Sequence, residues 1–241
     1  MAQQLEFIAE TGSTNADLVA RIARGEALAE GHWLIADRQN AGRGRQGRAW
    51  IDAPGNFMGS TAIRLHPQDP SPATLSFVAA LAVYETVLPR LAGPRALMLK
   101  WPNDLLLGGA KLAGILLERE HDYAVIGIGV NLVAAPTLPD RQAKAIADTG
   151  PAPARDAFAR DLAAQMDIEV QRWRKFGFDP IRRRWLAAAH PVGTALTVRD
   201  ATDAATNGIF DGLDEDGTLR LRLAGGAIRA IRAGDVMLGE S

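Results

Sequence analysis

The apolar positions of this chain recur with two different periods, and these periods predict its elements. Runs or alternations of apolar residues predict strands, whereas apolar residues three and four positions apart predict helices. The predicted strands are 5–9, 33–36, 56–65, 97–107 with a polar corner near Pro102, 111–118 and 123–130. The predicted helices are 16–25, 74–91, 155–173 and a helix through residue 190 that starts with Pro180 at its first position. The long apolar helix at 74–91 is expected to lie across a sheet.

After Pro191 the pattern changes to short alternating segments separated by turns such as Asp214-Glu215-Asp216-Gly217. These segments are 195–198, 207–210, 219–223, 228–231 and 236–238. Short strands at this spacing predict a small all-β module, a five-stranded barrel. The sequence therefore predicts two domains, residues 1–190 and residues 191–241, with 134–154 as a loop within the first.

Composition narrows the class of protein. The chain has 241 residues, 47% of them hydrophobic, and a net charge of −1, so it can fill a core and has no global attraction to nucleic acid or anionic membranes. It has no cysteine, and its four histidines lack the spacing of metal ligands. We find no apolar run close to the ~20 residues that span a bilayer, and no signal peptide. We expect a cytoplasmic protein that does not bind membranes.

The segment GRGRQGRAW at residues 42–50 is the most unusual stretch of the chain. Its glycines disfavour regular structure, so it is a loop. Glycine backbone N–H groups and arginine side chains both suit phosphate or carboxylate oxygens, which predicts an anion-binding loop. A solvated basic turn without a ligand is the alternative. The literal G-x-G-x-x-G pattern is not a dinucleotide fingerprint, because Pro54-Gly55 marks a turn where that motif needs a helix.

Lys111 starts the predicted apolar strand KLAGILLE, where an ammonium group is costly unless an anion neutralises it. Asp104, in the segment KWPND, is one candidate for this anion, and the pair of Lys111 and Asp104 is then structural. Alternatively, Lys111 faces ligand oxygens while Asp104 or Asn103 orients it or a metal ion.

Two further motifs have both a structural and a functional interpretation. Ser13 or Thr14 is expected to cap the first helix, and a helix N-terminus also offers donors to a ligand. Gly127 and Gly129 alternate on a strand, so they leave space on one face for a flat ring or an acyl chain, or else mark a bulge.

Taken in order, these motifs resemble those of the biotin protein ligases. The resemblance rests on Ser13-Thr14-Asn15, Gln39 with GRGRQGRAW, KWPND, KLAGILLE, GIGVN at 127–131 and the C-terminal β module, and it covers essentially the whole chain. It implies an α+β fold, with a mixed sheet like that of class II aminoacyl-tRNA synthetases and a C-terminal SH3-like barrel. It also implies ATP-dependent formation of biotinyl-5′-AMP with Mg²⁺, followed by transfer of biotin to a lysine of a biotin carboxyl carrier protein, such as that of acetyl-CoA carboxylase.

The resemblance also assigns roles to residues. Biotin is expected to contact Ser13, Thr14, Asn15, Gln39, Arg43, Gly44, Arg45, Lys111, Gly114, Gly127 and Gly129. ATP is expected to contact Arg45, Arg48, Trp50, Asn103, Lys111 and Asn131. Lys111, Arg45 and Asp104 are the predicted catalytic residues, with Asp104 also near Mg²⁺.

Two other functions remain open from the residues alone. A lipoate or octanoyl protein ligase or transferase shares the fold and the lysine, and a binding module could retain biotin without turnover. Because the first predicted strand begins within a few residues of Met1, we expect a monofunctional ligase without an N-terminal DNA-binding domain, and no DNA binding. A homodimer is left open.

Overall fold

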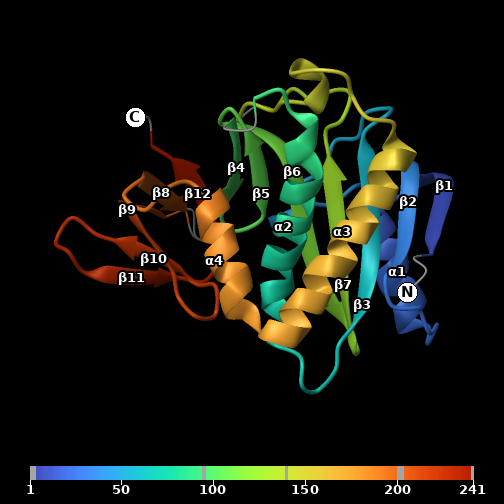
Figure 1. Ribbon diagram of the computed structural model, residues 1–241, viewed down its shortest axis with the longest axis horizontal. Helices are drawn as coiled ribbons and strands as arrows, with labels where there is room; N and C mark the ends of the chain where they lie inside the picture. Colours follow the sequence, from blue (N-terminus) through green and yellow to red (C-terminus); the bar gives the residue numbers. More distant parts are fainter. Residues whose placement is uncertain (1–3, 94–95, 139–140, 200–203, 240–241) are drawn as a thin grey trace.

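The computed structural model describes residues 4–93, 96–138, 141–199 and 204–239. Its main sheet has seven strands in the order β1-β2-β3-β7-β6-β5-β4 (Figure 1). β1 and β2 run parallel and the other neighbouring pairs antiparallel, so the sheet is mixed, as predicted. The strands are β1 (Leu5–Thr11), β2 (His32–Gln39), β3 (Phe57–Arg64), β4 (Leu97–Lys100), β5 (Asp104–Leu107), β6 (Ala110–Glu120) and β7 (Tyr123–Val130).

Helices cover both faces of this sheet. The helices are α1 (Thr14–Ala23), α2 (Leu75–Val87), α3 (Arg155–Phe176) and α4 (Phe178–Ala188). Leu18 of α1 packs in a small core with Ala62 and Val125 of β3 and β7. Their neighbours Ile63 and Ile126 point to the opposite face, because side chains alternate along a strand, and join the larger core that includes α2. Figure 1 shows α2, α3 and α4 together on that second face.

The predicted long apolar helix is confirmed as α2, flanked by single 3₁₀ turns. It is apolar around its whole circumference because it packs between the sheet on one side and α3 and α4 on the other. By length and composition the continuous helical segment Pro72–Arg90 is long and apolar enough to cross a membrane, contrary to our reading of the sequence. Its residues are mostly buried inside the protein, which accounts for the same composition.

The start of α4 differs from the prediction. The helix begins at Phe178, after Gly177 with a φ of 76°, so Pro180 is its third residue and not its first. Proline is tolerated there because the N–H groups of a first helical turn have no partner within the helix. The helix ends at Ala188, two residues before the predicted end.

The C-terminal segment forms an all-β module with five strands, as predicted; they make an antiparallel sheet in the order β11-β10-β9-β8-β12, and within the described residues β11 and β12 do not pair to close it into a barrel. Its strands are β8 (Ala195–Arg199), β9 (Ala205–Leu213), β10 (Leu219–Arg222), β11 (Ile228–Ile231) and β12 (Asp235–Leu238).

The two sheets share one continuous hydrophobic core. Phe77 of α2 packs edge-on against Phe178 and Trp185 of α4, with ring centroids 5.2 and 5.4 Å apart. The Trp101 indole N–H, after β4, donates to the carbonyl oxygen of Gly217 at 3.1 Å. Gly217, in the turn before β10, lies against this aromatic cluster, since a methyl group placed on it would lie 2.6 Å from Phe77. The turn and the Trp101 bond hold the C-terminal sheet at the β4 end of the main sheet, near the site described below.

Candidate active site

A cavity of about 380 Å³ opens on the face of the main sheet that carries α1. Its floor consists of two cross-strand rows, with Ser60, Gly127 and Leu116 in one and Gly129 and Gly114 in the next. Small residues dominate these rows, so the backbone of β7 lies close to the cavity. The N-terminus of α1 lies beside the first row.

The cavity brings together every residue that the sequence assigned to the site. These residues are Ser13, Thr14, Asn15, Gln39, Arg43, Gly44, Arg45, Arg48, Trp50, Asn103, Asp104, Lys111, Gly114, Gly127, Gly129 and Asn131. They come from segments more than a hundred residues apart, so their convergence is a property of the fold. Their individual roles stay predictions.

A hydrogen-bonded chain of neutral groups forms the end of the cavity at α1. Ser13 is the N-cap, and its Oγ accepts from the backbone N–H of Ala16 at 3.4 Å. The backbone N–H and the hydroxyl of Thr14 lie 2.7 and 3.0 Å from Gln39 Oε1. An amide oxygen only accepts, so Thr14 donates both bonds. Thr14 Oγ1 therefore accepts from the buried Ser60 hydroxyl, 2.8 Å away, and Gln39 keeps its Nε2 donors for other partners.

Asn15 has a structural partner in this part of the cavity. Its Nδ2 donates to Glu118 Oε2 of β6. Its Oδ1 is buried next to Gly127, and within the described residues it has no hydrogen-bond partner. Glu118 thus fixes the orientation of the Asn15 amide, because a carboxylate accepts and the bond must come from the NH₂ group.

The arginine loop is an irregular hairpin. Arg43 and Ala49 form an isolated antiparallel bridge, and the backbone N–H of Trp50 donates to the carbonyl of Gly42 at 2.9 Å. A 3₁₀ turn, Arg45–Gly47, forms its tip. The prediction of a loop is confirmed. The backbone hydrogen bonds of the hairpin hold its arginines at the edge of the cavity.

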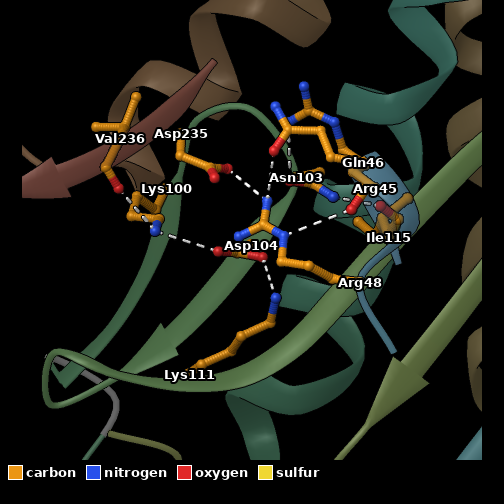
Figure 2. Close-up of polar contacts among 10 residues, drawn as sticks. All are labelled: Arg45, Gln46, Arg48, Lys100, Asn103, Asp104, Lys111, Ile115, Asp235 and Val236. Carbon is orange, nitrogen blue, oxygen red and sulfur yellow. Dashed lines mark hydrogen bonds and ion pairs between the residues drawn. The ribbon is translucent and has the colours of Figure 1, made fainter. Parts of the chain in front are cut away.

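Two arginines of this loop reach other elements (Figure 2). Arg45 Nη1 donates to Asn103 Oδ1 at 3.4 Å, and Asn103 Nδ2 donates to the carbonyl of Ile115. Arg48 Nη2 lies 2.5 Å from Asp235 Oδ1 of β12. Burial lowers the pKa of Arg45, and the charge of Asp235 opposes this change. A partly buried guanidinium that donates to a neutral amide is suited to a ligand anion.

The indole of Trp50 lies directly on the glycines of the second floor row. A methyl group placed on Gly129 would lie 2.3 Å from Trp50 Cε2, and one on Gly114 would lie 3.1 Å from Cζ3. The Lys111 ammonium lies 5.9 Å from the centre of the indole ring. The predicted space over Gly129 is therefore filled by the chain's own aromatic ring, whereas Gly127 is covered by Asn15.

Replacing Gly129 with alanine is expected to push the Trp50 indole off the sheet, because the new methyl group cannot fit within 3 Å of ring carbons. If Trp50 forms a wall of the nucleotide site, the KM for ATP should rise about tenfold while the melting temperature changes little. Steady-state kinetics and thermal unfolding measure both quantities. The control is Gly150→Ala, where no atom lies within 4 Å of the added methyl group. An unchanged KM would contradict a role of Trp50 in binding ATP.

A buried carboxylate holds two ammonium groups at the other end of the cavity (Figure 2). Asp104 Oδ1 lies 2.6 Å from Lys111 Nζ, and its Oδ2 lies 3.2 Å from Lys100 Nζ. Burial acts to raise the pKa of Asp104, but the charges and hydrogen bonds of the two lysines outweigh it, so this pKa lies below its usual range. Lys100 also donates to the carbonyl of Val236 at 3.0 Å. The two interpretations of Lys111 are thus compatible, since it pairs with Asp104 and lines the cavity.

The donor set around Asp104 does not fit a magnesium ion held by the protein. Both of its oxygens face ammonium groups, which would repel a divalent cation. Within the described residues, no group of three or more His, Cys, Asp or Glu side chains could hold a metal ion. We therefore assign no step to a protein-bound metal. Mg²⁺ commonly reaches such sites on the phosphates of its nucleotide.

Asn131, at the end of β7, ties a neighbouring segment to the cavity. Its Nδ2 donates to the carbonyl of Lys144 at 3.1 Å. The backbone N–H of Lys111 donates to the carbonyl of Gln142, and that of Lys144 donates to the carbonyl of Lys111, each at 2.9 Å. The segment around Ala143 thus runs beside the start of β6 and forms a wall near Lys111.

Sequence reasoning missed several residues that build the site. They are Ser60, Lys100, Glu118, Asp235 and Val236. Lys100 had a detectable signal, since it is a cation at the end of the apolar run Leu97–Leu99, close to Asp104 in sequence. No signal in the sequence pointed to the two residues of β12, because 187 positions separate Asp235 from Arg48.

Comparisons with known proteins agree with the motifs. The family model of the biotin/lipoate A/B protein ligase family matches residues 11–131, and that of the biotin protein ligase C terminal domain matches residues 193–239. The biotin–[acetyl-CoA-carboxylase] ligase of Paracoccus denitrificans is 40% identical over 97% of this chain and 100% of its own length. The protein of the same name from Mycobacterium tuberculosis is 38% identical over 98% of this chain and 89% of its own.

The fold has a close counterpart among solved structures. The biotin protein ligase from Aquifex aeolicus, in complex with biotin and ATP, aligns with a TM-score of 0.83 at 24% identity and covers 99% of each chain. This likeness shows that the predicted α+β fold with a C-terminal β module is right. The two family models and the similarity to full-length relatives establish that the chain belongs to the biotin/lipoate A/B protein ligase family.

Proposed function

We propose that the chain is an ATP-dependent biotin–protein ligase. The observation that carries the proposal is a single cavity with two chemically different ends. Neutral donors and acceptors of Ser13, Thr14 and Gln39 lie at one end, and the ammonium of Lys111 lies at the other with the arginine loop beside it. A ligand with a polar, uncharged ring and a distant carboxylate matches this arrangement. The names of the relatives from Paracoccus and Mycobacterium support it.

In the first half-reaction, a carboxylate oxygen of biotin attacks the α-phosphorus of ATP, and pyrophosphate leaves. Two anions must approach each other, so cations at the reacting atoms lower the barrier. We infer that Lys111, whose ammonium lines the cavity, contacts both the carboxylate and the α-phosphate, and that Arg45 and Arg48 carry the charge needed by the other phosphates. The hairpin of the arginine loop would also exclude water from the biotinyl-5′-AMP that forms.

In the second half-reaction, the neutral amine of a carrier lysine attacks the carbonyl carbon of the mixed anhydride. The C–O bond to AMP breaks, and an amide to biotin forms as the amine loses a proton. We infer from the names of the relatives that the carrier is the biotin carboxyl carrier protein of acetyl-CoA carboxylase.

The direct test is biotin-dependent release of pyrophosphate from ATP and Mg²⁺, followed by labelling of an apo-carrier domain. Release without labelling would restrict the function to adenylate formation. The absence of both signals at every biotin concentration would overturn the proposal. Competition between free biotin and free lipoate for binding separates the biotin ligase from a lipoate ligase of the same family.

Other properties follow from the same proposal. We infer that residues 1–190 form the biotin and ATP domain and residues 191–241 an accessory SH3-like domain. We also infer a cytoplasmic location and no operator binding, and a homodimer is the assembly to test first. Fractionation, a DNA mobility-shift assay and light scattering address these three points.

Replacing Arg45 with glycine is expected to release biotinyl-5′-AMP about tenfold faster, because the loop loses a half-buried cation that faces the cavity. Rapid filtration of enzyme-bound intermediate measures the release. Gln46→Gly is the matched control, since it adds a glycine to the same turn at a φ of 56°, which glycine adopts freely, and keeps the guanidinium. Equal release from wild type and Arg45→Gly would refute this role.

A further inference from the structure

The strand β12 contributes two groups to the cavity of the main sheet. Asp235 Oδ1 lies 2.5 Å from Arg48 Nη2, and the carbonyl of Val236 accepts from Lys100 at 3.0 Å (Figure 2). Lys100 in turn contacts Asp104, the partner of Lys111. The C-terminal sheet therefore contacts the arginine loop through Arg48, and it contacts Lys100, which shares Asp104 with Lys111.

The ion pair of Arg48 and Asp235 is too exposed to contribute much to folding. The two side chains keep 39% and 36% of their exposure. Ion pairs of this kind contribute roughly 0–1 kcal/mol and weaken with salt. Such a pair exchanges readily for a stronger partner, and a triphosphate with several negative charges attracts a guanidinium more strongly than a single carboxylate does.

The position of Asp235 conflicts with the charge of the expected substrate. Its carboxylate lines the cavity that, on the proposed function, receives a triphosphate. Its charge also acts on Arg45, where it raises the arginine's pKa more than the charge of Asp104 does. A negative group between two cations of the loop neutralises part of the positive charge that attracts phosphate.

We propose that Asp235 is an internal substitute for a phosphate group. Without nucleotide, it holds Arg48 and thereby keeps the arginine loop over the cavity. When the triphosphate arrives, Arg48 changes partner and Asp235 is released. The proposal rests on the proposed function, and it predicts that Asp235 orders the empty loop at the cost of weaker ATP binding.

The test replaces Asp235 with asparagine and measures two quantities. The KM for ATP is expected to fall about threefold to tenfold, because no ion pair has to be broken and a negative charge is gone. Without ligands, trypsin is expected to cut after Arg43, Arg45 or Arg48 several times faster, since the loop has lost its anchor. The difference in KM should shrink at high ionic strength. Asp235→Glu keeps the charge and should restore both properties toward those of the wild type.

Asp211→Asn is the matched control, because Asp211 is a carboxylate of the same C-terminal sheet that pairs with Arg220 and Arg222. It is expected to change neither quantity. A KM for ATP that is unchanged or raised in Asp235→Asn would overturn the proposal, and so would an unchanged rate of cleavage. Pyrophosphate release by the wild type tests the proposed function separately. If the wild type releases no pyrophosphate, the role of Asp235 is still tested by whether inorganic triphosphate protects the loop from trypsin.

Discussion

Replacing Lys111 with alanine is expected to lower biotin-dependent pyrophosphate release about a thousandfold while the fold stays intact. The ammonium lies in the cavity, 2.6 Å from Asp104 Oδ1, at the place where the biotin carboxylate and the α-phosphate of ATP would meet. Without it, the site loses the ammonium group that we propose neutralises both reactants at the same time. Asp104 keeps Lys100 as a counter-ion, so the carboxylate is not left unpaired. Pyrophosphate release and circular dichroism together measure the effect.

Two further variants make this result interpretable. Lys111→Met keeps the apolar stem beside Trp50 and removes only the charge, so it should be as inactive as the alanine variant. Lys144→Ala removes an ammonium that lies near Gly108 and does not line the cavity, and it should retain full activity. If both Lys111 variants lose their far-ultraviolet dichroism, Lys111 is structural. If they fold and retain activity within tenfold, it is not the catalytic cation.

Replacing Asp104 with asparagine is expected to reduce adenylate formation about a hundredfold and to destabilise the protein by roughly 2 kcal/mol. The neutral amide leaves two ammonium groups close together without a counter-ion, so Lys111 should turn away from the reacting atoms. Breaking a fully buried ion pair costs about 3–5 kcal/mol. The expected loss is smaller because both lysine side chains are partly exposed.

The destabilisation should depend on pH with a definite sign. The pKa of Asp104 is lower in the folded protein than its ordinary value, so the unfolded chain binds the proton more readily. Its contribution to stability is therefore fully present well above about pH 4, and it is lost as pH falls through the folded pKa. The difference in urea midpoint between wild type and Asp104→Asn should be constant from pH 7 to 5 and narrow only below that. A difference that grows on acidification would contradict the lowered pKa.

Asp122→Asn is the corresponding surface control, because its partner Arg64 is exposed. It should cost little stability at any pH and no activity. Equal losses in the two aspartate variants would indicate that the buried carboxylate between the two lysines has no special role.

The local pattern of apolar and polar residues predicted much of the fold. The β7 range was predicted at both ends, because an uninterrupted apolar run bounded by polar residues is typical of a strand buried on both faces. The boundary of α4 was less well predicted, because a proline fits at several positions of a first turn and Gly177 selected one of them.

The sequence by itself determined which groups this protein brings to its chemistry: a glycine and arginine loop, a lysine at the head of an apolar strand, and polar residues at a helix N-terminus. Each of these signals lies within a few consecutive residues, where composition and backbone preference are local properties. Only the tertiary structure decided the partners. It placed Asp104 between Lys111 and Lys100, and it set Asp235 against Arg48. Sheet register and the packing of the C-terminal sheet fix those contacts, and both depend on residues far apart in the chain.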